Sequence, residues 1–223
     1  MANAARPVLP IHTSAQLLGG YRWIEHRLFE LTGAWAAQAP LAEVQIFFDE
    51  TSARHAWRAG LWADRLPVLE GLDPDDLTVP FGPAVAPLFE ALAGEETEGV
   101  VQRLAGLSRV VLPRLAVTYG AHLARSTPVA DAPVIRVLRL ARRDVVESWL
   151  EGETVLEHLL RRPHDAQVAA SAQGGLEGVV VAAGVGPGLV PWPVEDPGVD
   201  DDPGLPELPQ LPEVHEAHGS LGP

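Results

Sequence analysis

Hydrophobic residues recur along four long segments of the chain at alternating three- and four-residue steps. This spacing places apolar side chains on one stripe of a helix, so each segment is predicted to be a helix that packs against others. The stripe of the first segment consists of Leu17, Tyr21, Ile24, Leu28, Leu31 and Trp35. The pattern predicts an all-α fold in which four helices form a bundle.

Residues that cap or break helices mark the expected ends of these segments. We expect helices over residues 13–33, 41–66, 98–125 and 132–162, with the break at Gln38-Ala39-Pro40 as the alternative end of the first. A hydroxyl of Thr13 or Ser14 is predicted to cap the first helix, and the Asp131 carboxylate to cap the fourth. Pro113 is expected to kink the third helix. The stretch between the second and third helices is rich in Pro, Gly and Asp, which predicts a long crossover with one short helix at 84–92.

The composition changes after Pro163. Residues 166–189 are mostly Ala, Gly and Val without an evident helical period, and residues 191–223 are rich in Pro and acidic residues. Such sequences bury too little apolar area to offset the entropy lost on ordering. We therefore predict a helical bundle over residues 1–163 and a disordered Pro/Gly-rich acidic tail over residues 164–223.

Charge and cysteine content narrow the classes of partner. The chain has 16 Lys and Arg residues against 30 Asp and Glu residues, a formal net charge of −14. Phosphate backbones and anionic membranes are repelled by this charge, so we expect no nucleic-acid or membrane partner. The absence of Cys excludes disulfides and thiolate sites. The N-terminus lacks the pattern of a secretory signal, which predicts a cytoplasmic protein.

Bundles of this size often hold two iron or manganese ions. Their ligands include a Glu-x-x-His motif on each of two helices, since that spacing aims a carboxylate and an imidazole at one point. No Glu-x-x-His occurs here, and the nearest candidate reads Ser52-Ala53-Arg54-His55. We therefore favour no bound metal. If iron is present, the ligands would have to come from an irregular set consisting of Glu25, His55, His122 and Glu153.

Two histidines lie on predicted inward faces. The second helix presents Val44, Phe48, Thr51, His55, Trp62 and Leu66. The third presents Val101, Leu104, Ser108, Val111, Leu115, Thr118 and His122. Together with Glu25, the histidines could hold one metal or relay a proton. The alternative is that each imidazole bonds to Thr51, to Thr118 or to a carbonyl and has a structural role.

The segment from Leu18 to Glu30, the Gly33-Ala34-Trp35 turn and the Pro40-Leu41-Ala42-Glu43-Val44 helix start resemble ferritin-like proteins. They are most similar to the non-catalytic structural subunit of the phenylacetyl-CoA epoxidase group, in which an Arg-Leu-x-Glu helix precedes a Pro-Leu-x-Glu helix start. The resemblance implies a metal-free bundle that works within a protein complex.

The C-terminus offers one further motif. Gly219-Ser220-Leu221 follows a Pro-rich spacer and is similar to the docking peptides of ferritin-like cargo in encapsulin shells. The alternative is an inert, solubilising tail. An encapsulin shell is therefore one candidate partner.

Three functions follow from these observations. The leading hypothesis is a metal-poor ferritin-like bundle that acts by association, as a homodimer or as the scaffold subunit of a larger complex. The second is a diiron or mononuclear non-haem iron oxidase that uses the irregular ligand set. The third is a shell cargo docked through the C-terminal Gly-Ser-Leu segment. The tryptophans on the predicted helices are interpreted as anchors in the bundle or in a dimer interface.

Overall fold

The computed structural model describes residues 9–68, 71, 73–94, 97 and 99–190. These residues form helices joined by turns, and none of them lies in a strand. The prediction of an all-α protein is confirmed. Within the same residues, every helix is too short or too polar to reach across a lipid bilayer.

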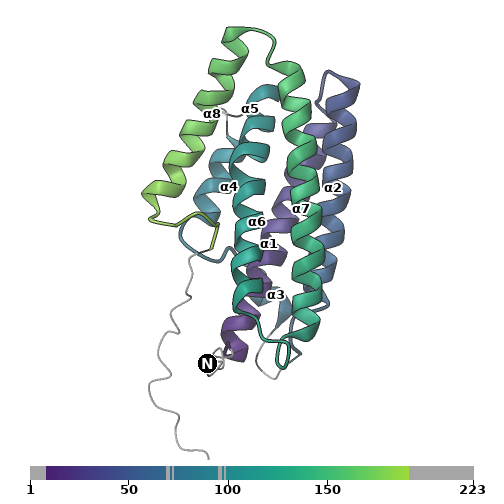
Figure 1. Ribbon diagram of the computed structural model, residues 1–223, viewed down its shortest axis with the longest axis vertical. Coiled ribbons are helices and arrows are strands. Elements are labelled where there is room, and N and C mark those ends of the chain that lie inside the picture. Colours follow the sequence, from purple (N-terminus) through teal and green to yellow (C-terminus); the bar gives the residue numbers. More distant parts are fainter. Residues whose placement is uncertain (1–8, 69–70, 72, 95–96, 98, 191–223) are drawn as a thin grey trace, which may run out of the picture.

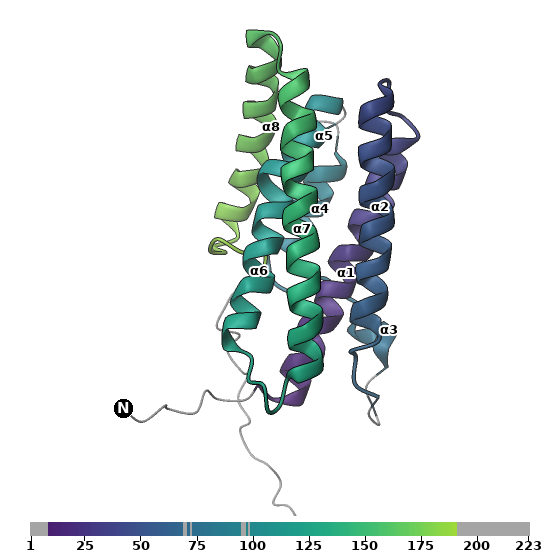
Figure 2. The same ribbon diagram turned by 45° about the vertical axis from the view of Figure 1, so that its right-hand side comes forward.

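Four long rods lie side by side along the longest axis of the molecule (Figure 1). They are α1 (Ile11–Ala36), α2 (Ala42–Ala63), a composite third rod and α7 (Ala132–Leu159). The third rod joins α5 (Val100–Ala105), a π-helical turn η2 (Gly106–Val111) and α6 (Leu112–Arg125) without a break. α1 and α7 run in one direction, and α2 and the third rod run in the other (Figure 1). Figure 2 shows α1 paired with α2, and α6 paired with α7.

The predicted inward stripe of α1 is correct. Leu17, Tyr21, Ile24 and Leu28 are fully buried, and Trp35 is 4% exposed. The predicted cap is wrong, because α1 begins at Ile11 and no side chain caps it. The carbonyl of Pro10 instead accepts a hydrogen bond from the Ser14 backbone N–H at 2.9 Å. Pro10 is the residue just before the helix, and its side chain has no acceptor with which to cap the first turn.

The crossover lies against α1. It contains α3 (Pro74–Leu77) and α4 (Val85–Ala93), and α4 confirms the short helix predicted at 84–92. Gly19 permits the close approach, because a Cβ there would lie 2.0 Å from the Leu77 carbonyl oxygen. Arg22 reinforces the contact by donating to Thr78 Oγ1 at 3.0 Å. The long connection between α2 and the third rod is therefore packed onto the bundle.

The third rod carries its irregularity next to Pro113. Proline has no N–H to donate to the carbonyl four residues earlier, which lies at Arg109. The six residues that precede α6 adopt the wider i→i+5 hydrogen-bond pattern of a π-helix. Such insertions are a known accommodation of an interrupted hydrogen-bond ladder. The sequence predicts a proline kink within this rod, and the structure places there a π-helical turn that ends at Val111, two residues before the proline.

α7 begins where the sequence predicted, with Pro133 in its first turn. The predicted role of Asp131 is wrong, because its carboxylate does not cap α7. Asp131 Oδ2 instead accepts the Thr127 backbone N–H at 2.8 Å, in the turn that connects α6 to α7. An Asp side chain can accept a hydrogen bond from a turn N–H group as readily as from a helix N–H group, and Asp131 bonds to the turn.

The predicted domain boundary is also wrong. Residues 163–182 form a regular helix, α8 (Pro163–Ala182), where we expected the tail of residues 164–223 to begin. Pro163 occupies the first turn of α8, and Asp165 Oδ2 accepts the Arg162 N–H at 3.1 Å. The buried side chains of α8 are Ala169, Ala172, Leu176 and Val180. α8 packs against α4, α5 and η2, on the side of the molecule away from α2 (Figures 1 and 2).

The chain beyond α8 returns to the third rod. Leu189 is fully buried, and its backbone N–H donates to Thr118 Oγ1 at 2.8 Å. The globular part of the chain therefore extends to Val190. The remainder of the predicted tail, including Gly219, Ser220 and Leu221, lies outside the described residues.

Candidate functional site

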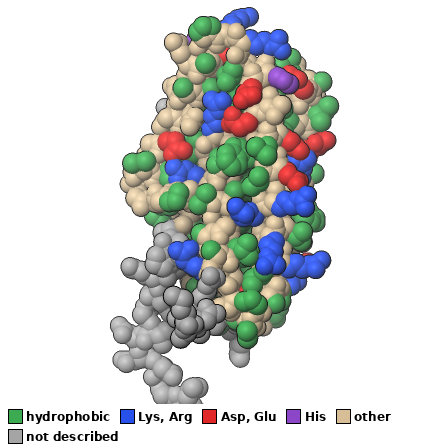
Figure 3. Space-filling view, in the orientation of Figure 1, with side chains coloured by type: hydrophobic (Ala, Val, Ile, Leu, Met, Phe, Trp, Pro, Cys, Tyr) green, Lys and Arg blue, Asp and Glu red, His purple; other side chains and the backbone are tan. Residues whose placement is uncertain are grey.

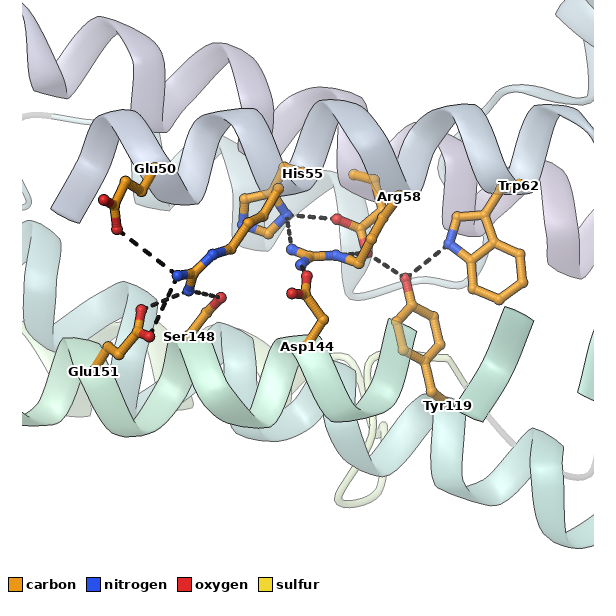
Figure 4. A network of polar contacts seen from close by, with 10 residues as sticks. Glu50, His55, Arg58, Trp62, Tyr119, Asp144, Ser148 and Glu151 are labelled. Atoms are coloured by element: carbon orange, nitrogen blue, oxygen red, sulfur yellow. Dashed lines mark hydrogen bonds and ion pairs between the residues drawn. The ribbon is translucent and has the colours of Figure 1, made fainter. Parts of the chain in front are cut away.

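A network of polar side chains crosses the middle of the bundle (Figure 4). Glu25 comes from α1, His55 and Arg58 from α2, Tyr119 from α6 and Asp144 from α7. Glu25, His55, Arg58 and Tyr119 have no exposed surface, and the Asp144 side chain is 22% exposed. Each of the four rods contributes at least one member, so the network cross-links all of them.

Arg58 is the centre of the network. Its Nε donates to Glu25 Oε1 at 2.9 Å, and its Nη1 donates to Asp144 Oδ2. The guanidinium thus bridges carboxylates from α1 and α7, and Figure 4 shows it directed toward Asp144. Burial lowers the pKa of Arg58, but the charge of Glu25 and its hydrogen bond outweigh burial and raise that pKa above its usual value. The cation is permanent at any pH at which the protein folds.

Glu25 is an ionised carboxylate in a place without solvent. Tyr119 donates its hydroxyl to Glu25 Oε1 at 2.6 Å, and Trp62 Nε1 donates to the same Tyr119 oxygen at 3.1 Å. Burial raises the pKa of Glu25, but Arg58, His55 and Tyr119 together overcome burial and lower it to about 2. Hydrogen bonds to the charged form have this effect on any carboxylate.

His55 is neutral, because burial and the neighbouring Arg58 cation lower its pKa to about 4. Its Nδ1 lies 2.5 Å from Glu25 Oε2 and 2.6 Å from Arg58 Nη2. Nδ1 cannot donate to one and accept from the other. Glu25 Oε2 has no other donor among the described residues, so we assign the proton to Nδ1 and treat the Arg58 approach as a donor–donor contact. His55 Nε2 then carries a lone pair.

Three buried polar atoms lie near the network without a hydrogen-bond partner among the described residues. They are His55 Nε2, Thr51 Oγ1 and Ser108 Oγ. Thr51 lies one helical turn before His55, and Ser108 lies in the π-helical turn opposite Gly152 of α7. In the structural alternative each imidazole bonds to Thr51, to Thr118 or to a carbonyl. The Thr51 branch is wrong, because Thr51 Oγ1 has no partner among the described residues. Thr118 Oγ1 donates to the Arg114 carbonyl at 2.8 Å.

The structure divides the residues that the sequence suggested as iron ligands. Glu25 and His55 lie together, as expected. The Nδ1 atom of His122 lies 3.2 Å from the Tyr21 hydroxyl oxygen, and Glu153 is bound by Arg109 at 3.1 Å. No group of three or more His, Cys, Asp or Glu side chains with metal-binding geometry occurs within the described part of the chain. The irregular ligand set is therefore not assembled.

His122 forms a second, aromatic part of the same core. Burial lowers its pKa to about 4, which the Asp131 carboxylate opposes without reversing. The Tyr21 ring packs against Trp62, Tyr119 and His122, with ring centroids 5.2, 5.1 and 5.8 Å apart. Edge and tilted contacts of this kind add rigidity beyond the area that they bury.

Sequence reasoning identified Glu25 and His55 but missed Arg58, Tyr119 and Asp144. Arg58 occupies the predicted inward stripe, seven residues after Thr51 and four before Trp62. That helical register was the available signal.

Comparison with known proteins finds no family model, no curated protein and no solved structure that matches this chain. The function must therefore be argued from the geometry of the site.

The side chains of this network are paired with one another, and this pairing limits the reactions that they can take part in. The Glu25 carboxylate is neutralised by Arg58 and saturated by three donors, so it is a weak base. Nε2 of the neutral His55 imidazole keeps a free lone pair, but the lowered pKa of His55 makes this atom a weak base as well. The site is thus an internal, charge-balanced brace.

Proposed function

We propose that the chain is a ferritin-like bundle with a long crossover that acts by association, as a homodimer, and not through a metal centre. The observation that carries the metal-free part of this proposal is the position of Arg58 between Glu25 and Asp144. A ferritin-like arrangement is supported by the directions of the rods, with α1 and α7 parallel and α2 parallel to the third rod (Figure 1). One crossover of the kind found between residues 63 and 100 produces that order.

The donor set of the core does not suit a metal ion. A di-metal centre needs carboxylates from all four helices and imidazoles with free lone pairs that converge on one cavity. Here a guanidinium already balances the two central carboxylates. A metal cation at the same place would have to displace Arg58, whose side chain is fully buried. Such a displacement would leave a buried, unpaired cation, which is strongly unfavourable.

Association is supported by the outer face of α2. Ile46 and Trp57 are 58% and 49% exposed, and the exposed Ala53 and Gly60 lie on the same side of the helix. Tryptophan is enriched at the centres of protein interfaces, and small residues beside it let a partner helix approach closely. We define Ile46, Ala53, Trp57 and Gly60 as the α2 outer face. A second copy of the chain placed around a two-fold axis would cover both such faces.

The test of association is sedimentation of the full chain over a range of micromolar concentrations. We expect the wild type to sediment as a dimer and Trp57→Asp to sediment as a monomer with an unchanged circular dichroism spectrum. The matched control is Val181→Asp, which places the same charge on α8 at a side chain that is 72% exposed. A wild type that stays monomeric at the highest concentration would contradict the proposal, as would equal effects of the two variants.

Metal analysis distinguishes this proposal from an iron oxidase. Protein purified without chelator is expected to hold far less than one iron per chain. Stoichiometric iron that disappears in a His55→Ala, His122→Ala double variant would overturn the proposal, because those side chains would then be ligands. The double variant must be compared with the wild type at equal folded fraction, measured by circular dichroism.

A further inference from the structure

A groove between α6 and α7 is lined by arginines. It is lined by Leu123 of α6 and by Arg139, Arg142, Arg143, Val146 and Glu147 of α7. Its volume is about 360 Å³. We call this feature the arginine groove. Figure 3 shows several basic side chains with few acidic ones over the lower half of the face, where α7 begins, and both acidic and basic side chains above them.

The charge of the arginine groove is largely uncompensated. Arg143 pairs with Glu147 at 2.9 Å, on an exposed surface. Arg139 and Arg142 form no ion pair with an acidic side chain in the part of the chain that the structure describes. The whole chain has a net charge of −14, so a local excess of positive charge is unexpected. Charges of one sign in a groove attract a segment or a ligand of the other sign.

The chain itself contains a segment of the required charge. Residues 191–223 hold eight Asp and Glu residues and no Lys or Arg. Three of the acids are consecutive, Asp200-Asp201-Asp202. An acidic stretch of this kind matches arginines that are spaced along one helix, because guanidinium groups bind carboxylates through paired hydrogen bonds.

The segment also starts close enough to reach the groove. The described chain ends at Val190, directly after Leu189, which is bonded to Thr118 of α6. Thr118 and Leu123 are about 8 Å apart along a helix axis, and a helix with its side chains is about 10 Å wide. The stretch from Val190 to Asp200 can extend over roughly 33 Å. The consecutive acids can therefore reach the arginines without any change in the bundle.

We propose that the acidic segment of residues 191–223 docks into the arginine groove of its own chain through Asp200, Asp201 and Asp202. Docking screens the positive groove and leaves the rest of the surface negative. The proposal does not depend on the proposed function, because the arginine groove and the α2 outer face lie on different sides of the bundle. It also explains why a strongly acidic tail accompanies an arginine-rich helix in one chain.

The absence of Cys makes a spin-label experiment on the full chain direct. A nitroxide attached to Gly204→Cys should broaden the backbone amide signals of residues 139–143 and Leu123. Broadening should be weak at Ala53 and Gly60 on α2, which serve as internal references. At about 0.5 M NaCl the screening length falls to roughly 4 Å, so the broadening of the groove signals should largely disappear.

Two charge variants make the test specific. In the labelled chain, the groove variant Arg139→Gln/Arg142→Gln/Arg143→Gln should abolish the broadening of the groove amides. The tail variant Asp200→Asn/Asp201→Asn/Asp202→Asn should abolish it too, because it removes the opposite charges of the same contact. Arg27→Gln/Arg161→Gln is the matched control, with exposed arginines on other elements, and should leave the broadening intact. Circular dichroism checks that each variant is folded.

The proposal is overturned if the groove amides broaden no more than those of Ala53 and Gly60 in low salt. It is also overturned if the glutamine variant keeps the broadening, because the contact would then not be made by the arginines. Without groove broadening, shifts of the residue 139–143 amides on adding a short oligonucleotide or anionic vesicles would assign the groove to an external polyanion.

Discussion

Replacement of Arg58 by methionine is the sharpest test of the internal brace. Methionine fills a similar volume but removes the cation that Glu25 and Asp144 share. Glu25 would remain fully buried with Tyr119 and His55 as its partners. Removing one partner of a buried ion pair costs about 3–5 kcal/mol, because the other charge is left uncompensated. We expect Arg58→Met to lower the free energy of unfolding by that amount.

A matched control lies one turn earlier on α2. Arg54 also bridges to α7, through Glu151, but its side chain is 28% exposed and that of Glu151 is 47% exposed. Exposed ion pairs contribute about 0–1 kcal/mol. Arg54→Met should therefore cost less than about 1 kcal/mol. The contrast between two arginines on the same helix separates the effect of burial from the effect of helix propensity.

A triple variant tests whether the cost of Arg58→Met comes from the charge left behind. In Glu25→Gln/Arg58→Met/Asp144→Asn the carboxylates are neutralised together with the cation. Replacing a complete buried ion network by neutral groups is often close to neutral in stability. We expect the triple variant to be more stable than Arg58→Met, although it has two more substitutions.

Urea unfolding followed by far-ultraviolet circular dichroism measures these differences, provided that the m-value stays constant between variants. The reasoning is refuted if Arg58→Met stays within about 1 kcal/mol of the wild type. It is equally refuted if the triple variant loses the sum of the three single losses, because independent sites add and coupled sites do not.

Four further outcomes are expected from the same unfolding assay. The pKa of His122 is lowered to about 4 from 6.5. Between these two pH values the unfolded chain therefore binds a proton at His122 that the folded chain does not bind. Protonation of His122 should therefore account for a loss of about 3 kcal/mol as the pH drops from 6.5 to 4, and His122→Gln should remove this part of the slope. His55, whose pKa is also lowered to about 4, should add a comparable loss that His122→Gln leaves in place. Gly152→Ala should destabilise by about 1–3 kcal/mol, since its Cβ would lie 2.2 Å from Ser108 Oγ. Gly178→Ala, which meets open space on α8, should instead stabilise by about 0.5–1 kcal/mol. Leu176→Ala should cost about 2–5 kcal/mol, and a neutral result would show that α8 contributes little to the core.

The long amphipathic helices could be predicted from the sequence because their buried residues are large. Leu, Ile, Phe and Trp recur with the helical period on the buried face, and the polar residues of the opposite face make this period easy to recognise. The same rule failed for α8, whose buried positions include Ala169 and Ala172. Alanine is common on both faces of this helix, so the sequence shows no difference in hydrophobicity between its buried and its exposed face. Pro163 was read as the end of one helix although it also begins the next, a position that proline favours.

Helix ends and polar partners were predicted less well than helices. Thr13 and Asp131 have the right chemistry for caps, but Pro10 starts α1 and Asp131 serves a turn. Side-chain hydrogen bonds depend on which group arrives within about 3 Å, and helical register alone does not fix that distance. The same limit explains why the sequence placed His55 in the core beside Glu25 but did not predict Arg58 as its other neighbour.

Arg58 shows which sequence signal could have predicted the polar network in the core. Its register on α2 places it on the inward stripe, but an arginine is usually assigned to the surface because a buried charge is costly. A buried arginine must be compensated by carboxylates from the helices that face it. Glu25 lies near the buried stripe of α1, and Asp144 lies next to buried Val145 of α7. A search of the stripes for opposite charges at matching heights would therefore have suggested the brace before any coordinates. The Glu25–His55 contact, read as half of a metal site, belongs instead to a charge-balanced cross-link.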